Sequence, residues 1–333
     1  MKMNRYIDLH LHLDGAVTVG IARALAELQG IELPADDGQL ERLLTVPEDC
    51  SDLNEFLKCF GLPLSLMQTH EGLREAVRLV GDSMAEQGII YAEIRFAPQL
   101  HTDKGLTQEA AVRAALEGLG RTKLKANLIL CAMRGDSNED KNEETLRLAQ
   151  KYLVKDGGVV ALDLAGAEGL FPTEKYREFF AKAQACGVPF TIHAGEADGA
   201  QSIRAALEFG AARLGHGVRI IEDEELIELV KERGVALEMC PTSNRQTHAV
   251  EDMSAYPLIS LLERGVPVTL NTDDPGIEGI DIAHEYRYME SLLGLDEVQE
   301  RVILKNAVKA AFTTDEVKAQ LMRELGNENI GEA

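Results

Sequence analysis

The run from Tyr6 to Asp14 alternates apolar and polar residues with a period of two, which is typical of a β-strand. The polar positions, Asp8, His10, His12 and Asp14, therefore share one face of the strand. Histidines at i and i+2 on one strand can both reach a single cation, because imidazole is the commonest side-chain metal ligand. A half-buried strand with a solvated polar face explains this run equally well when it is taken alone.

Three later runs that read as strands also end in residues able to bind a metal or move a proton. These runs are Thr191–Glu196, Leu214–Gly217 and Leu270–Pro275. The residues concerned are His193, Glu196, His216, Asp273 and Asp274. Four strands that all end in such residues, at the same end of a predicted sheet, are difficult to obtain by chance. We therefore favour a functional site over the solvated strand face.

Composition limits the class of protein. The 333 residues are 45% hydrophobic and 27% charged, which indicates a globular chain. A net charge of −22 leaves no basic face to neutralise phosphates, so we expect no nucleic-acid polymer as a partner. No apolar run approaches the length of a membrane span, and residues 1–6 lack the apolar core of a signal peptide. We expect a cytoplasmic protein that does not bind membranes.

The five cysteines, Cys50, Cys59, Cys131, Cys186 and Cys240, are scattered and odd in number. No pair has the two-residue spacing of a zinc-binding motif. The pattern predicts reduced thiols, and it argues against both a disulfide framework and a cysteine-based zinc site.

Strand-like runs alternate with amphipathic helical segments along the chain. The predicted strands are Tyr6–His12, Ile90–Phe96, Asn127–Met133, Val159–Leu164, Pro189–His193, Arg213–His216, Val235–Met239 and Pro267–Asn271. Eight strands joined by helices predict an α/β fold, a (β/α)₈ barrel, with an open doubly wound sheet as the alternative. The carboxyl ends of barrel strands form the rim where chemistry takes place, and the polar residues fall at those ends.

The segment between the first two strands is too long for a simple crossover. Its apolar residues Leu53, Phe56, Leu57 and Phe60 have helical spacing, so residues 20–85 are interpreted as a barrel helix plus inserted helices. The inserted helices either cover the rim as a lid or are ordinary core helices.

We expect one domain over residues 1–333. Residues Thr313–Glu316 resemble a capping box that opens a last helix through Leu325, followed by a loose tail at 327–333.

The candidate residues suit hydrolytic metal chemistry. His10, His12, His193 and Asp273 offer three nitrogens and one oxygen, a set that suits zinc with a position left for water. Iron and cobalt fit the same donors. Glu196 lies three residues after His193 and can act on a substrate without being a ligand.

Two further roles follow from the same strand ends. His216 and Asp273 can orient or deprotonate the attacking water. Asp274 can accept a hydrogen bond from a substrate.

Six motifs together resemble the adenosine deaminase family. They are His-Leu-His-Leu-Asp-Gly at 10–15, Asp-Leu-Ala-Gly at 163–166, His-Ala-Gly-Glu at 193–196, Gly-His-Gly at 215–217, Cys-Pro-Thr-Ser-Asn at 240–244 and Asn-Thr-Asp-Asp-Pro at 271–275. They occur in the family's order. The resemblance implies zinc-dependent deamination of adenosine and 2′-deoxyadenosine in purine salvage, with one zinc ion per chain.

The resemblance also implies a role for each matched residue. Zinc would be held by His10, His12, His193 and Asp273. Glu196 would donate a proton to purine N1, and His216 would assist the attacking water. Gly166 would offer its N–H to N3, Asp274 would face N7, and His12 and Asp14 would lie near the ribose 5′-hydroxyl.

Other functions remain open at this point. A deaminase of free adenine or of a 5′-modified adenosine is the closest alternative, although relatives that act on adenine commonly carry Glu in place of Asp14. A two-metal amidohydrolase is disfavoured because strand 159–164 and the two residues after it contain no lysine. Glu196 and His216 argue against a non-catalytic protein that binds nucleosides. One departure from the family is Ala167, where many relatives have Asp, and it leaves the hydrogen bonding of that loop in doubt.

Overall fold

Eight parallel strands form the centre of the computed structural model, which describes residues 5–47, 50 and 53–326. The strands are β1 (Tyr6–His12), β2 (Ile89–Phe96), β3 (Ala126–Met133), β4 (Val159–Ala165), β5 (Thr191–Ala194), β6 (Arg213–His216), β7 (Ala236–Met239) and β8 (Val268–Leu270). All eight predicted strands are confirmed. The fifth and eighth begin after the predicted starts at Pro189 and Pro267, because proline has no N–H to give to a sheet.

Two four-stranded sheets, β1-β2-β3-β4 and β5-β6-β7-β8, make up this centre. They join on both sides by single parallel bridges, between Leu162 and Phe190 and between Leu11 and Asp273. At the second junction the His12 N–H donates to the Asp273 carbonyl (2.9 Å), and the Asp273 N–H donates to the His10 carbonyl (2.8 Å). With both edges joined, the fold is the predicted (β/α)₈ barrel and not an open sheet.

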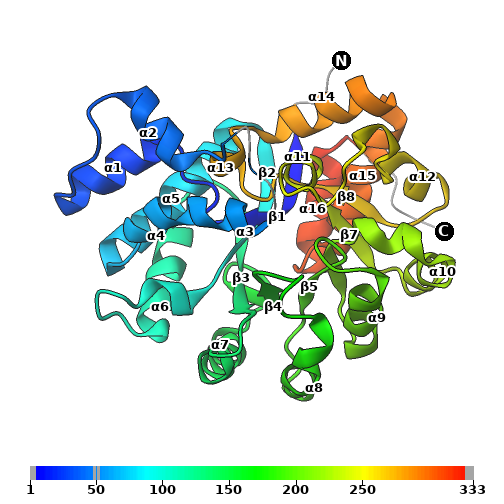
Figure 1. The fold of residues 1–333 in the computed structure, drawn as a ribbon, viewed down its shortest axis with the longest axis horizontal. Helices are drawn as coiled ribbons and strands as arrows, with labels where there is room; N and C mark the ends of the chain where they lie inside the picture. Colours follow the sequence, from blue (N-terminus) through cyan, green and yellow to red (C-terminus); the bar gives the residue numbers. More distant parts are fainter. Residues whose placement is uncertain (1–4, 48–49, 51–52, 327–333) are drawn as a thin grey trace.

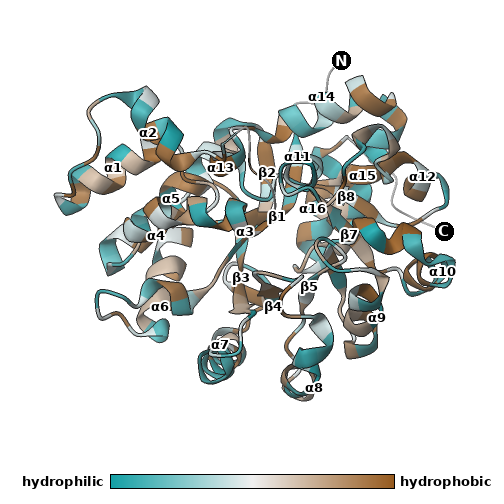
Figure 2. Ribbon diagram, viewed as in Figure 1, coloured by the Kyte–Doolittle hydropathy of each residue, from teal (hydrophilic) through white to brown (hydrophobic). Residues whose placement is uncertain are grey.

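Helices surround the strands, as Figure 1 shows. The principal ones are α5 (His70–Glu86), α6 (Gln108–Leu119), α7 (Glu139–Tyr152), α8 (Arg177–Ala185), α9 (Ala200–Phe209), α10 (Glu224–Arg233), α12 (Leu258–Glu263) and α15 (Glu297–Ala310). Figure 2 shows hydrophobic residues concentrated on the central strands and hydrophilic residues on the outer helix faces. In α5, Leu73, Val77, Val80 and Met84 recur at helical spacing and are all buried, which explains its packing on the barrel.

Between β1 and α5 lie the inserted helices α1 (Val19–Gln29), α2 (Asp37–Leu44), α3 (Leu53–Phe56) and α4 (Gly61–Ser65), with a 3₁₀ turn at Leu57–Phe60. Leu53, Phe56, Leu57 and Phe60 line a cavity at the barrel rim, so this part of the insertion covers the rim. Met67, which lies between α4 and α5, is instead buried in the main hydrophobic core. One part of the insertion therefore covers the rim, and another part packs as ordinary core.

Four further α-helices lie in the second half of the chain. They are α11 (Pro241–Gln246), α13 (Pro275–Glu278), α14 (Ile282–Leu293) and α16 (Asp315–Glu324). The predicted capping box at the last helix is wrong. Thr314, not Thr313, caps α16 by accepting the Val317 N–H, and a valine at that position cannot reciprocate as Glu316 was expected to do. The predicted loose tail at 327–333 lies outside the described residues.

None of the five cysteines forms a disulfide in the described ranges, as their scatter predicts. No helix in the described ranges is long and apolar enough to cross a membrane.

Candidate active site

Four candidate ligands converge at the carboxyl end of the barrel. His10 and His12 lie at the end of β1, His193 lies on β5, and Asp273 follows β8. His193 Nε2 lies 3.1 Å from His10 Nε2 and 3.2 Å from His12 Nε2. Asp273 Oδ1 lies 3.1 Å from His10 Nε2 and 3.4 Å from His12 Nε2. Donors about 2.0–2.1 Å from a tetrahedral zinc ion are about 3.3 Å apart, so this spacing fits the metal.

Buried carboxylates orient two of these imidazoles. His10 Nδ1 lies 2.7 Å from Glu238 Oε2, and His193 Nδ1 lies 2.9 Å from Asp163 Oδ2. An ionised carboxylate can only accept a hydrogen bond, so Nδ1 carries the proton and donates it to that bond. We therefore assign both rings the tautomer that leaves Nε2 free to bind a metal. Carboxylate–histidine pairs of this kind also make the imidazole a more basic ligand.

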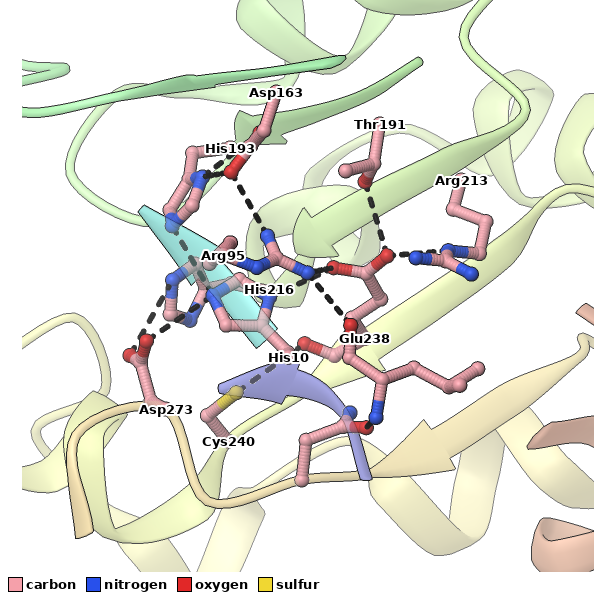
Figure 3. A network of polar contacts seen from close by, with 12 residues as sticks. His10, Arg95, Asp163, Thr191, His193, Arg213, His216, Glu238, Cys240 and Asp273 are labelled. Atoms are coloured by element: carbon pink, nitrogen blue, oxygen red, sulfur yellow. Dashed lines mark hydrogen bonds and ion pairs between the residues drawn. The ribbon is translucent and has the colours of Figure 1, made fainter. Parts of the chain in front are cut away.

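Arg95 connects the two carboxylates beneath the ligands (Figure 3). Its Nη1 donates to Asp163 Oδ2 (2.9 Å), and its Nη2 donates to Glu238 Oε2 (2.8 Å). The guanidinium is fully buried. Burial alone would raise the pKa of Asp163, but its interactions with His193 and Arg95 lower it below its usual range. Asp163 therefore stays ionised inside the barrel.

His216 lies beside the ligands, with its own orientation fixed. The Asn244 side-chain amide donates to His216 Nδ1 (3.0 Å), and its oxygen accepts a hydrogen bond from the Tyr256 hydroxyl (2.9 Å). Because Nδ1 accepts, we assign the proton to His216 Nε2, which lies 3.7 Å from Asp273 Oδ2 and 3.6 Å from Glu196 Oε2. A protonated Nε2 cannot be a ligand, so His12 is the better fourth donor.

Two residues of the site have an unusual backbone conformation. His216 (φ 59°) and Asp273 (φ 62°) are two of the three non-glycine residues with positive φ in the described ranges. This region of backbone conformation is costly for residues with a Cβ, and such residues cluster at functional sites.

Glu196 follows β5 and is only 4% exposed. Burial, reinforced by the negative charges of Asp273 and Glu168, raises the pKa of Glu196 to about 8. The group is therefore mainly protonated at neutral pH. A neutral carboxylic acid beside a metal-binding cluster is suited to donate a proton to a substrate.

The other candidates line the same cavity, which has a volume of about 880 Å³ including its open mouth. Asp14, Gly166 and Asp274 all contribute to its wall. Asp274 fits there because residue 15 is glycine: a Cβ at Gly15 would lie 1.7 Å from Asp274 Oδ1. All nine candidate residues are thus brought together, and the roles assigned to them stay predictions.

Sequence reasoning missed several residues that support the site. They are Arg95, Asp163, Glu168, Glu238 and Asn244. Asp163 and Asn244 stood inside two of the quoted motifs, and Arg95 and Glu238 were charged residues inside otherwise apolar strands. The doubt raised by Ala167 is resolved one residue later, because the buried Glu168 accepts hydrogen bonds from the loop that carries Glu196.

The fold and the site define a metal-dependent hydrolase of the barrel type. A family model described as adenosine deaminase matches residues 6–328. An adenosine deaminase of Haemophilus ducreyi is 48% identical, over 95% of this chain and 94% of its own.

Among solved structures, an adenine deaminase from Arthrobacter aurescens is 27% identical with a TM-score of 0.85, over 97% of this chain and 98% of its own. An N6-methyl-AMP deaminase from Arabidopsis thaliana is 25% identical with a TM-score of 0.81, over 98% of this chain and 97% of its own. The chain belongs to the adenosine deaminase family.

Arg95→Met should lower the free energy of unfolding by about 3–5 kcal/mol, because it removes the arginine partner of the buried Asp163 and leaves the buried Glu238 with Arg213 alone. Urea denaturation followed by circular dichroism measures the change. Arg147→Met is the matched control: Arg147 is 54% exposed and pairs with surface carboxylates, so its loss should cost about 0–1 kcal/mol. Equal effects of the two substitutions would contradict the importance of the buried network.

Proposed function

We propose that this protein hydrolyses adenosine and 2′-deoxyadenosine to inosine and 2′-deoxyinosine, with release of ammonia, in cytoplasmic purine salvage. One observation carries the proposal: His12, His193 and Asp273 of the four-donor cluster line the same cavity as the buried Glu196, whose pKa is raised to about 8. Membership of the adenosine deaminase family supports the same reaction.

Zinc, one ion per chain, is the metal that the donor set favours. His10, His12 and His193 supply neutral nitrogens and Asp273 supplies a carboxylate oxygen, at the spacing described above. When bound, zinc lowers the pKa of water toward about 7 and so supplies a nucleophile at neutral pH. Glu238 and Asp163 keep His10 and His193 in the tautomer that this role requires.

Glu196 is the proton donor in this mechanism. Its proton passes to purine N1, which withdraws electrons from C6. The water oxygen adds at C6 and gives up both of its protons. One, taken up by Asp273, passes to the exocyclic nitrogen, so that the bond between C6 and this nitrogen breaks and ammonia leaves. The other restores the Glu196 carboxyl group. His216, whose Nε2 lies within 3.7 Å of both Glu196 and Asp273, orients the water for this addition.

The remaining candidates bind the nucleoside. Gly166 offers its N–H to N3, and its φ of 101° is a conformation that glycine adopts without strain. Asp274 meets the N7 side of the base. Burial raises the pKa of Asp14 to about 6, so this group is ionised at neutral pH and can accept a hydrogen bond from a ribose 5′-hydroxyl.

Deamination of free adenine is the second candidate, favoured by the likeness to an adenine deaminase of known structure. Asp14 argues against it, because a buried carboxylate in the wall of the cavity suits a sugar hydroxyl. The same carboxylate argues against 5′-phosphorylated substrates, since it repels a phosphate in a poorly screened site.

Purified protein should contain about one equivalent of zinc per chain, because His10, His12, His193 and Asp273 make up a single mononuclear site. His193→Ala should lose metal and activity together. Elemental analysis and adenosine turnover measure the two effects, and His70→Ala, on the surface of α5, is the control that keeps both. Two tightly bound ions per chain would contradict the mononuclear site.

Glu196→Gln should retain metal and nucleoside binding but lose about 10²–10⁴-fold in kcat, since an amide cannot supply the N1 proton. Steady-state kinetics with adenosine and binding of inosine separate the two properties. Glu232→Gln, an exposed change of the same type on α10, should leave turnover unchanged. Near-normal turnover of the Glu196 variant would assign the proton to another group.

Adenosine and 2′-deoxyadenosine should be better substrates than AMP or free adenine, because Asp14 binds the 5′-hydroxyl and repels phosphate. Asp14→Ala should weaken the preference for adenosine and leave the metal content intact. The measurement is kcat/KM for the four compounds with both proteins. If the wild-type protein prefers adenine or AMP, the nucleoside assignment is wrong even though the deamination chemistry stands.

A further inference from the structure

Glu168, which no step of the mechanism uses, is a fully buried carboxylate just beyond the carboxyl end of β4. Its two oxygens accept five hydrogen bonds from the segment that follows β5. The donors are the N–H groups of Gly195 (2.7 Å), Glu196 (2.9 Å), Ala197 (2.7 Å) and Asp198 (3.0 Å) and the Ser202 hydroxyl (2.5 Å). We call this arrangement the Glu168 clamp.

The clamp provides an acceptor for backbone N–H groups that the turn at Gly195 would otherwise leave unpaired. Gly195 has a φ of 78°, and this turn points four consecutive N–H groups toward one place. Successive N–H groups that converge in this way form a concave site for an anion. Without an acceptor they would be unpaired inside the protein, and without its donors a buried carboxylate would be very costly. Each partner therefore requires the other.

The backbone of Glu196 is held on both sides. Its N–H is held by Glu168, and its carbonyl accepts a hydrogen bond from Arg219 Nε (2.9 Å). A chain of hydrogen bonds also connects the clamp to the proposed metal ligand His193. Ser202 contacts Thr173 (2.6 Å), and Arg134 donates to both the Thr173 hydroxyl (2.9 Å) and the His193 carbonyl (2.6 Å).

These contacts connect the acid to the ligand His193 through four buried side chains, those of Glu168, Ser202, Thr173 and Arg134. We propose that Glu168 and Arg219 are positioning residues, which hold the Glu196 backbone so that its carboxyl group faces the reacting base. The inference rests on the proposed function, because it assigns Glu196 the proton transfer. A displacement of about 1 Å from the productive geometry can cost about 10²-fold in rate.

The principal test is a double-mutant cycle on the metal-loaded protein with adenosine as substrate. Glu168→Gln keeps the shape of the side chain but replaces one accepting oxygen with an amide that cannot accept an N–H. We expect kcat to fall by about 10²-fold with KM and metal content close to wild type. In a Glu196→Gln background the same change should alter kcat by less than about twofold, because no acid remains to be positioned.

Two further variants complete the design. Arg219→Gln changes a side chain that is 35% exposed, so the protein should fold, and it should show the same pattern with a loss of about tenfold in kcat. Asp82→Asn is the matched control. Asp82 also accepts a backbone N–H, from Lys123 (2.9 Å), but does so at the opposite end of the barrel, and kcat should not change.

Hydrogen–deuterium exchange of the peptide that covers residues 195–198 provides a readout independent of turnover. It should be faster in Glu168→Gln than in wild type and unchanged in Asp82→Asn. The proposal is overturned if exchange there is unaltered, or if the kcat loss is equally large in both Glu196 backgrounds. If wild-type protein does not deaminate adenosine, the proposed function fails, and the exchange result still decides whether the clamp holds this loop.

Discussion

The hydrogen bonds that close the barrel between β1 and β8 determine the geometry of the whole site. The backbone groups of His10, His12 and Asp273 make these bonds, and the side chains of the same residues are three of the four proposed ligands. Closing the sheet therefore brings together residues that lie more than 250 positions apart in the chain. The left-handed backbone at Asp273 is the local cost of this arrangement.

Buried charge is the second determinant. Arg95 and Arg213 are both buried in the barrel interior and share the carboxylate of Glu238. Arg95 also pairs with Asp163, and Arg213 also pairs with Glu93. Such groups contribute little net stability compared with a hydrophobic core. Their contribution here is orientation, because the carboxylates that neutralise the arginines also set the tautomers of His10 and His193. The barrel interior thus supports the site directly beneath it.

The sequence was sufficient to predict the barrel, because period-two strands and their polar ends are local patterns. It also grouped His10, His193 and Asp273, since the carboxyl ends of parallel strands must meet on one rim. Glu168 could not be found in this way, because its donors lie 27–34 positions further along the chain and four of them are backbone groups. Asn244 was present in a motif, but its action on His216 depends on how β6 and α11 pack. The cap of α16 was misplaced by one residue, because Thr313 and Thr314 are equally good caps by composition.

The ligand set has a consequence for folding as well as for chemistry. Two donors come from the first four-stranded sheet and two come from the second sheet or the segment after it, so neither half of the barrel offers a complete site. A cation that binds all four recognises the closed barrel and not the unfolded chain. By mass action, such binding stabilises the native state by about 2.7 kcal/mol when the free ion exceeds its dissociation constant a hundredfold. The supply of metal in the cell would then help to set the fraction of chains that is folded.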